Sequence, residues 1–365
     1  MQATVLFNEL LTPNHPEKDV YHIGLETEAP LGYLPGDWLM VSGENSLDLV
    51  ALVLEKLGLS GNEPIELRRL GEMPVKEALH YHLELTQLNP AILNKLKRQY
   101  DLNDWTDRAE MMAYAEGRDI LDLLDAYPFL KGIDACALLT PLAPRYYSIA
   151  SAPKAVGDNR VDLVYRKVFF ERDSRERKGV VTTALSTLAT GDKIDVALSK
   201  NRNFKLPIAL EESMAQHAPV IMVGSGTGVA PFIGFLQEWF LEEKLAKNHQ
   251  AWLFFGETHE EKSHLFKDMM AEWKTAGLQL RTAFSRDQAH KVYVQDRLWE
   301  ERESLWQLLE QGAFFYLCGD KTRLKTDVES TMLAILQTEG GMTEDAAETL
   351  WHDWKKQRRV QLDVY

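Results

Sequence analysis

The sequence predicts a β domain that is interrupted by a helical insertion and followed by a doubly wound parallel α/β domain. Strand-like runs occupy residues 1–50 and return at about 144–206, which indicates that two distant segments build one β domain. Between them, from about 46 to 135, apolar residues follow helical spacing. From residue 219 strands and helices alternate, as is typical of a parallel sheet with helices on both faces.

Composition favours packed domains and argues against several classes of protein. The 365 residues suffice for two or three domains, and an apolar content of 45% supplies their cores. The formal net charge of −14 argues against nucleic-acid or anionic-membrane binding, because phosphate groups would be repelled. Cys136 and Cys318 are the only cysteines and form no CxxC pair, so we expect no thiolate-bound metal and no disulfide framework.

Targeting signals are also missing from the sequence pattern. No apolar run approaches the ~18 residues that a membrane helix requires. The N-terminal stretch MQATVLFNELLTPNHPEK has no basic segment followed by an apolar run, as a signal peptide would have. We therefore expect a cytoplasmic protein with no metal site, no membrane partner and no nucleic-acid partner.

The first half of the chain is expected to form short strands around the helical stretch. Asn89-Pro90 is a good helix start, because proline suits the first helical position. The expected strands are residues 4–11, 19–28, 38–42, 145–151, 161–170 and 193–199. Helical spacing covers residues 46–59, 74–85, 89–100 and 107–127, and a turn with a short helix is expected at 179–190.

The second half is expected to alternate between strands and helices. The expected strands are residues 218–224, 251–257, 278–286 and 313–320. The expected helices are residues 231–245, 263–277, 294–312 and 327–341. This order predicts a parallel sheet with helices on both faces.

A glycine-rich turn, Gly224 to Pro231, lies between the first of these strands and its helix. Glycines let the backbone approach a phosphate closely, and the helix start supplies free N–H groups and partial positive charge. An ordinary tight turn is the alternative, but the strand–turn–helix context favours nucleotide binding. The spacing is not GxGxxG, so an ordinary dehydrogenase is not the natural match.

A basic cluster follows the third strand of this half. Ser285, Arg286 and Lys291 together suit a phosphate dianion, and Tyr293 adds a hydroxyl or a stacking face. Taken alone, the cluster reads as a solvated loop. Glu257 competes with this interpretation, because an acidic residue after the second strand can bind a ribose 2′-OH and favour NAD. We favour the basic cluster, since several donors converge there against one carboxylate.

Two further motifs are weaker when taken alone. Residues Arg145 to Ser151 place a cation, two aromatic rings and a hydroxyl on one strand, which equally fits an aromatic-rich strand with an edge arginine. Residues Gly179 to Thr182 form a glycine-led helix start, a common and unspecific pattern.

The ordered set of motifs resembles the FAD/NADPH module of the diflavin reductases, the group that includes the sulfite reductase flavoprotein, cytochrome P450 reductase and nitric oxide synthase reductase. RYYSIAS and GVVTTAL resemble the family's FAD motifs, and VGSGTGVAPF, LFFGE, AFSRDQAHKVYVQ and YLCGD resemble its NADPH motifs in the right order. PGDWLMVS and PVKEALHYHLELT also fit, and the tail from GGM to RRVQLDVY resembles the sulfite reductase flavoprotein in particular. The resemblance covers nearly the whole chain.

The resemblance implies an antiparallel FAD-binding β-barrel at residues 1–207, with the helical insertion at about 46–135, and a doubly wound NADPH-binding domain at 208–365. It implies hydride transfer from NADPH to FAD, followed by electron transfer to a flavodoxin or FMN-domain protein, possibly with a sulfite reductase haemoprotein. The alternatives are a flavodoxin/ferredoxin-type reductase that serves another acceptor, such as a P450, and a non-catalytic FAD-binding subunit.

The resemblance also implies a role for each matching residue. For FAD, Arg145 would pair with a phosphate, Tyr147 would stack on the isoalloxazine ring, and Gly179, Val180, Val181 and Thr182 would hold the pyrophosphate. Tyr146 would also belong to the cofactor-binding residues. For NADPH, Gly226 and Thr227 would meet the pyrophosphate, and Ser285, Arg286, Lys291 and Tyr293 would bind the 2′-phosphate. Gln295 would also belong to the cofactor-binding residues. Ser148, Cys318 and Asp363 would surround the hydride-transfer site, and Tyr365 would cover the flavin.

Two departures from the family pattern stand out. Full-length members carry an FMN-binding domain before the FAD module, whereas Met1 already lies within the module, so we expect the FMN domain to be a separate protein or to have been removed. In addition, Val164 to Lys167 replace the small and apolar residues usual beside the flavin. Arg166 near the ring is therefore expected to shift its redox potential.

Overall fold

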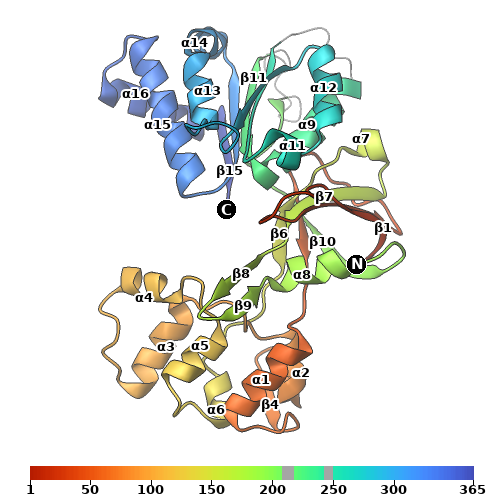
Figure 1. Ribbon diagram of the computed structural model, residues 1–365, viewed down its shortest axis with the longest axis vertical. Coiled ribbons are helices and arrows are strands. Elements are labelled where there is room, and N and C mark those ends of the chain that lie inside the picture. Colours follow the sequence, from red (N-terminus) through yellow and green to blue (C-terminus); the bar gives the residue numbers. More distant parts are fainter. Residues whose placement is uncertain (208–217, 242–249) are drawn as a thin grey trace. The chain divides into compact units, whose positions relative to one another are not determined.

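The computed structural model describes residues 1–207, 218–241 and 250–365 (Figure 1). The chain divides into two compact units, each assembled from segments that are distant in sequence. The first unit consists of Met1–Met40, Tyr146–Arg166 and Ala189–Tyr365. The second consists of Val41–Arg145 and Lys167–Leu188.

An antiparallel barrel forms one part of the first unit. Its six strands have the order β6-β3-β10-β1-β2-β7. A bridge between Ile149 and Leu163, with a bond from Ala150 N to Asp162 O of 2.8 Å, links the chain after β6 to β7 and closes the sheet on itself. The predicted pairing of two distant β segments in one barrel is therefore confirmed. The strands are β1 (Gln2–Leu10), β2 (Val20–Thr27), β3 (Trp38–Val41), β6 (Arg145–Ser148), β7 (Arg160–Arg166) and β10 (Lys193–Ser199).

The strand expected at 161–170 is wrong in its second half. β7 ends at Arg166, and residues Phe169–Arg172 form a new strand, β8, that pairs with β9 (Arg175–Lys178). Val168 explains the break, because its N–H donates to Thr182 Oγ1 (3.1 Å) and its carbonyl accepts from Gly179 N (2.9 Å). These bonds divert the chain from the barrel to the start of helix α8 (Val180–Thr187).

A parallel sheet forms the other part of the first unit. Its five strands have the order β13-β12-β11-β14-β15, and every neighbouring pair is parallel. The alternating residues of β11 pack into separate clusters on the two faces, as expected for a sheet covered by helices on both sides. The predicted doubly wound domain is confirmed. The strands are β11 (Val220–Ser225), β12 (Ala251–Glu257), β13 (Gln279–Phe284), β14 (Phe314–Gly319) and β15 (Val360–Val364).

Two of the helices expected in this domain differ in the structure. The helix expected from 263 begins at Lys267, because Phe266 has a left-handed backbone (φ 56°) that separates α12 from α11. The helix expected at 294–312 is divided at Glu301. Residues 242–245 of the helix expected at 231–245 lie outside the described part of the chain. The helices are α9 (Ala230–Leu241), α11 (Glu260–Ser263), α12 (Lys267–Thr275), α13 (Val294–Glu300), α14 (Arg302–Glu310), α15 (Arg323–Thr338) and α16 (Glu344–Lys356).

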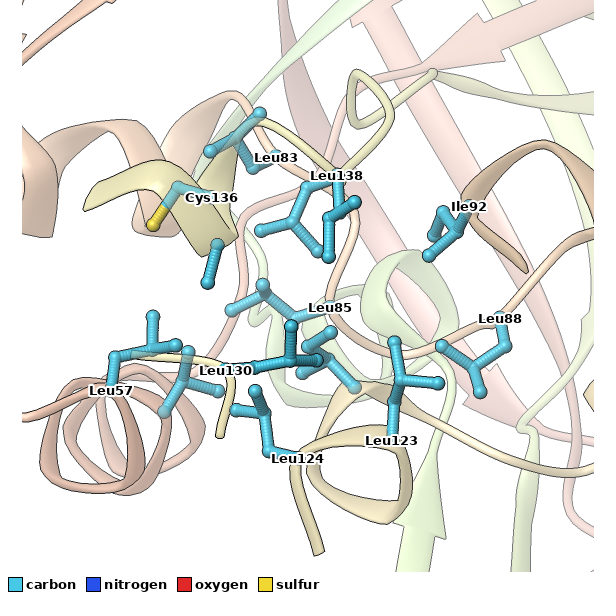
Figure 2. Close-up of a cluster of buried hydrophobic side chains, with 14 of the residues drawn as sticks. Leu57, Leu83, Leu85, Leu88, Ile92, Leu123, Leu124, Leu130, Cys136 and Leu138 are labelled. Atoms are coloured by element: carbon cyan, nitrogen blue, oxygen red, sulfur yellow. The ribbon is translucent and has the colours of Figure 1, made fainter. Parts of the chain in front are cut away.

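The second unit is mainly helical and has its own apolar core. Figure 2 shows part of this core, in which leucines of several helices and loops converge around Leu85 and Leu130. The predicted helix start at Asn89-Pro90 is confirmed, since the Asn89 side chain accepts from the N–H groups of Ala91 and Ile92. Besides α8, its helices are α1 (Leu47–Leu57), α2 (Val75–Tyr81), α3 (Pro90–Tyr100), α4 (Arg108–Ala115), α5 (Ile120–Ala126) and α6 (Gly132–Cys136).

Candidate functional site

The carboxyl ends of the five parallel strands place the candidate site. The chain runs outward from β11 to β12 and β13, and then returns to β14 and β15 on the other side of β11. The order of strands therefore reverses between β11 and β14. In open α/β sheets, ligands bind at this switch point, outside the carboxyl ends of the strands.

The glycine-rich turn follows β11 at the switch point. Gly226 has a left-handed backbone (φ 56°), which starts the 3-10 turn Gly226–Val229 that leads into α9. A Cβ at Gly228 would lie 2.2 Å from the carbonyl oxygen of Cys318, so only glycine lets the turn approach β14 this closely. A turn of this shape ahead of a helix suits an anionic group.

Three of the predicted catalytic residues, Ser148, Cys318 and Asp363, lie together around the Asp363 carboxylate. Cys318 on β14 and Asp363 on β15 are partners in the parallel register. Ser148 Oγ, at the end of β6, donates to Asp363 Oδ2 at 2.6 Å, and Cys318 Sγ lies 3.9 Å from the same oxygen. The structure thus brings Ser148, Cys318 and Asp363 together, in agreement with the arrangement that the resemblance implies.

Trp38 completes this cluster and was missed by sequence analysis. Its indole Nε1 donates to Asp363 at 3.1 Å (Oδ1) and 3.2 Å (Oδ2), across 325 residues of chain. Nothing in the motif PGDW indicates that its tryptophan would bind Asp363. The carboxylate is therefore held by a hydroxyl on one side and by an indole on the other.

Burial dominates the electrostatics of the cluster. Only 8% of Asp363 is exposed, and desolvation raises the pKa of its carboxyl above the ordinary value, although the hydrogen bonds from Ser148 and Trp38 act in the opposite direction. Burial, with the nearby Asp363 carboxylate, raises the pKa of the Cys318 thiol well above its ordinary value. Cys318 is therefore a neutral thiol at physiological pH and is unsuited to act as a nucleophile.

Tyr365 joins this cluster to the glycine-rich turn. Its hydroxyl lies 2.9 Å from Thr227 Oγ1, its N–H donates to Gly319 O (3.1 Å), and its carbonyl accepts from Lys321 N (3.0 Å). The residue is 64% exposed even so. Tyr365 thus presents an accessible ring on a backbone that is fixed at both sides.

The predicted basic cluster lies at the end of β13. The N–H groups of Ser285 and Arg286 donate to the carbonyls of Glu257 (2.9 Å) and Thr258 (2.8 Å), which brings the two residues beside the end of β12. The Arg286 guanidinium donates to Glu17 at 2.9 Å. The other members lie on the following loop and on the start of α13: Lys291 and Tyr293 are exposed, and Gln295 donates to Asp327 at 3.3 Å.

Glu257, the competing carboxylate, has a partner of its own. Its side chain is buried and forms an ion pair with Lys18, while its other oxygen accepts from Thr258 N at 2.9 Å. Lys18 lies in the loop between β1 and β2, 239 residues away, so this pair is not evident from the sequence. The negative charge of Glu257 is therefore compensated by Lys18 within the protein.

The aromatic residues near Ser148 belong to the barrel. Tyr146 is exposed and packs edge-on against Trp38, with ring centroids 5.9 Å apart. Tyr147 packs edge-on against Tyr165 at 6.5 Å. Tyr165, flagged as a departure from the family pattern, is buried, and its ring stacks on Tyr21 at 5.3 Å. Arg166, from the same stretch, is exposed.

The remaining predicted FAD residues lie in the second unit. Arg145 donates to Glu84 and to the carbonyl of Ala143, both at 2.6 Å. Gly179 is the N-cap of α8, and its lack of a side chain leaves the N–H groups of Val180 and Val181 uncapped by it. Thr183 Oγ1 in the same turn is buried, and no hydrogen-bond partner for it exists in the described residues. A helix start with these free donors fits a phosphate group.

The described residues contain neither a metal-binding cluster nor a helix that could span a membrane. No group of three or more His, Cys, Asp or Glu side chains in the described parts is arranged to hold a metal ion. Among the helices at 1–207, 218–241 and 250–365, none has the length and apolarity needed to cross a bilayer.

Comparison with known proteins finds relatives for the whole chain. Residues 222–330 match the oxidoreductase NAD-binding domain. The whole chain aligns with sulfite reductase [NADPH] flavoprotein alpha-components: it is 38% identical to that of Cronobacter sakazakii and 37% identical to that of Bacillus subtilis. It covers 60% and 61% of these proteins, so the chain spans about three fifths of the length of the curated relatives it matches. Residues 222–330 are thus similar to an oxidoreductase NAD-binding domain, and the whole chain is similar to about three fifths of the flavoprotein components of sulfite reductase.

Proposed function

We propose that the protein binds FAD and NADPH and passes electrons from NADPH to a partner protein. The observation that carries the proposal is the assembly of Ser148, Cys318 and Asp363 at the switch point, next to the glycine-rich turn. FAD, when bound, supplies the acceptor for the hydride of NADPH. The domains are proposed as residues 1–207 for FAD, with the insertion at about 46–135, and 208–365 for NADPH.

The residues of this chain fit both ligands. For FAD, the free donors at the start of α8 suit the pyrophosphate, and the exposed ring of Tyr146 and the neighbouring Tyr147 suit a planar ring system. Arg145 would serve a phosphate, in exchange for part of its bonding to Glu84.

For NADPH, Gly226 and Thr227 would receive the pyrophosphate at the start of α9. Ser285, Arg286, Lys291, Tyr293 and Gln295 would form the 2′-phosphate site. This assignment is supported by the half-exposed guanidinium of Arg286, which faces only a solvent-exposed glutamate in the described structure. A phosphate dianion can replace such a partner at low cost, because exposed ion pairs are weak.

The side chains around Asp363 orient and shield the reacting groups. Ser148 keeps its proton on Oγ and donates a hydrogen bond to Asp363 Oδ2, which fixes the direction of the hydroxyl group. Cys318 keeps its proton on Sγ, which makes it a small neutral side chain beside the reaction site. The Tyr365 ring would keep water away from the site until the nicotinamide arrives, which fits its exposed position next to Thr227.

The proposed electron acceptor follows from the proposed reaction and from the names of the relatives. The relatives are flavoprotein components of sulfite reductase, which supports a flavodoxin or FMN-domain protein as acceptor, possibly with a sulfite reductase haemoprotein. A reductase that serves another acceptor, such as a P450, differs only in this partner. The cytoplasmic location predicted from the sequence belongs to the same proposal, and cell fractionation tests it.

The experiment is to release the flavin from the purified protein, identify it by chromatography, and follow its absorbance after anaerobic mixing with NADPH. FAD without FMN is expected, with loss of the oxidised flavin band and NADPH-dependent reduction of ferricyanide. Stoichiometric FMN would contradict the proposed domains. If the protein contains FAD that NADPH does not reduce, the result would refute the proposed reductase activity and favour a non-catalytic FAD-binding subunit.

A further inference from the structure

The loop between β1 and β2 reaches the carboxyl ends of β12 and β13. Thr12 folds the loop back on itself, since its Oγ1 donates to Lys18 O (2.7 Å) and accepts from Val20 N (2.9 Å). His15 Nε2 then lies 3.0 Å from Thr258 Oγ1, directly after β12. This loop is far in sequence from every coenzyme motif, yet it borders the proposed 2′-phosphate site.

Two adjacent residues of the loop form two ion pairs of opposite polarity. Lys18 binds Glu257, and Glu17 binds Arg286. The pairs differ in their exposure to solvent. The side chains of Lys18 and Glu257 are 11% and 1% exposed, whereas those of Arg286 and Glu17 are 51% and 66% exposed. The first pair is therefore a fixed part of the structure, and the second is open to exchange.

The position of Glu257 gives the buried pair its importance. A carboxylate after the second strand of a doubly wound sheet accepts bonds from a ribose diol and repels a 2′-phosphate. A buried carboxylate is also costly unless a cation compensates it. Lys18 provides that cation, and its Nζ lies 3.5 Å from the point that a Cβ on Gly226 would occupy. The ammonium thus borders both the carboxylate and the glycine-rich turn.

We infer that Lys18 is a specificity-determining residue, which favours NADPH over NADH by neutralising Glu257. The inference rests on the proposed function, because it concerns the coenzyme site of that reductase. Without Lys18, Glu257 would be an uncompensated acid beside Arg286. The 2′-phosphate would meet repulsion, while the diol of NADH would find an acceptor.

The test is calorimetric binding of adenosine 2′,5′-bisphosphate, NADP⁺ and NAD⁺ to the purified protein, with no turnover involved. Lys18→Met is expected to weaken the two 2′-phosphorylated ligands by about ten- to a hundredfold, as for the loss of one charged interaction, and to leave NAD⁺ within about threefold. Adding Glu257→Gln to Lys18→Met should restore most of the loss. Lys56→Met, which breaks the Lys56–Asp125 pair of the second unit, is the matched control and should leave the affinity for all three ligands unchanged.

The outcomes separate the inference from the function on which it rests. Wild-type protein that binds none of the three ligands refutes the proposed function itself. Wild-type binding with equal losses for NADP⁺ and NAD⁺ in Lys18→Met overturns the inference, and so does a selective loss that Glu257→Gln fails to restore. If Lys18→Met does not fold, the single variant Glu257→Gln tests the inference. It should bind NADP⁺ at least as tightly as wild type, and weaker binding overturns the inference.

Discussion

The indole of Trp38 donates to both carboxylate oxygens of Asp363, at 3.1 and 3.2 Å. Trp38 lies on the barrel strand β3, and Asp363 lies on β15 of the parallel sheet. The bond therefore joins the two sheets of the first unit at the proposed reaction site. It also stabilises the charged form of a carboxyl group whose burial acts in the other direction.

Trp38→Phe should shift the pH dependence of flavin reduction. Loss of the indole bond removes a contribution that lowers the pKa of Asp363, so this pKa should rise further above its ordinary value. In stopped-flow experiments across pH, the rate of flavin reduction by NADPH should fall as Asp363 becomes protonated. As the pH is lowered, this fall should begin at a higher pH in Trp38→Phe than in wild type. A purely structural role would lower the rate equally at every pH.

Asp363→Asn should stabilise the fold at neutral and alkaline pH. Because the folded-state pKa is raised, Asp363 favours folding fully below its ordinary value of 3.8, and this contribution is lost as pH rises through the folded pKa. The amide has no such loss, so the Tm of the variant should exceed that of wild type at pH 8 by roughly 1–3 °C. The difference should vanish towards pH 4. A constant difference in scanning calorimetry at all pH values would contradict this.

Cys318→Ala and Ser148→Ala should slow hydride transfer more than they weaken coenzyme binding. Both side chains approach the same oxygen of Asp363, and neither lies on the proposed phosphate sites. We expect flavin reduction to fall by about tenfold or more, in the range found for positioned polar groups, with NADP⁺ affinity within a few-fold. Variants that are reduced as fast as wild type in stopped-flow experiments would make Cys318 and Ser148 ordinary packing residues.

Arg286→Ala should raise the NADPH KM by about ten- to a hundredfold, because one charged hydrogen bond contributes ~1.5–3 kcal/mol. NADH should be affected little. Glu17→Gln is the opposing variant: it releases the guanidinium of Arg286 and should lower the NADPH KM a few-fold at low salt. Equal damage to both coenzymes by Arg286→Ala would show that the residue serves the fold or the common part of the ligand.

Deletion of Tyr365, or Tyr365→Ala, should reduce the preference for NADPH. The exposed ring would have to leave before the nicotinamide binds, and the 2′-phosphate contacts help NADPH to offset that cost. Removing the ring should help NADH most, so the ratio of the two kcat/KM values should fall. An unchanged ratio with unchanged flavin absorbance would show that Tyr365 does not stack on the flavin.

Local signals predicted much of the fold and part of the site. Asn89-Pro90 marks a helix start through its own backbone chemistry, and Gly226 marks a turn that needs a left-handed residue. Such features are visible because the cause lies within a few residues. Phe266 shows the limit: its left-handed backbone breaks an otherwise regular helical pattern, and an aromatic residue gives no local sign of this.

Partnerships across the fold could not be predicted in this way. Lys18 meets Glu257 across 239 residues, and Trp38 meets Asp363 across 325. Neither lysine nor tryptophan is unusual where it stands in the sequence. Ser148, Cys318 and Asp363 were found only because the resemblance to a family placed them together, since no spacing in the chain relates three strands that are so far apart.

The clearance at Gly228 sets the dimensions of the site by backbone atoms alone. With only 2.2 Å available between a Cβ there and the Cys318 carbonyl, every amino acid other than glycine is excluded, and the gap between turn and strand cannot widen or narrow with the choice of side chain. Side chains around it can therefore diverge, changing coenzyme preference or acceptor, while the distance between the proposed phosphate-binding turn and the proposed reaction site stays the same. Geometry and specificity can thus evolve separately in this protein.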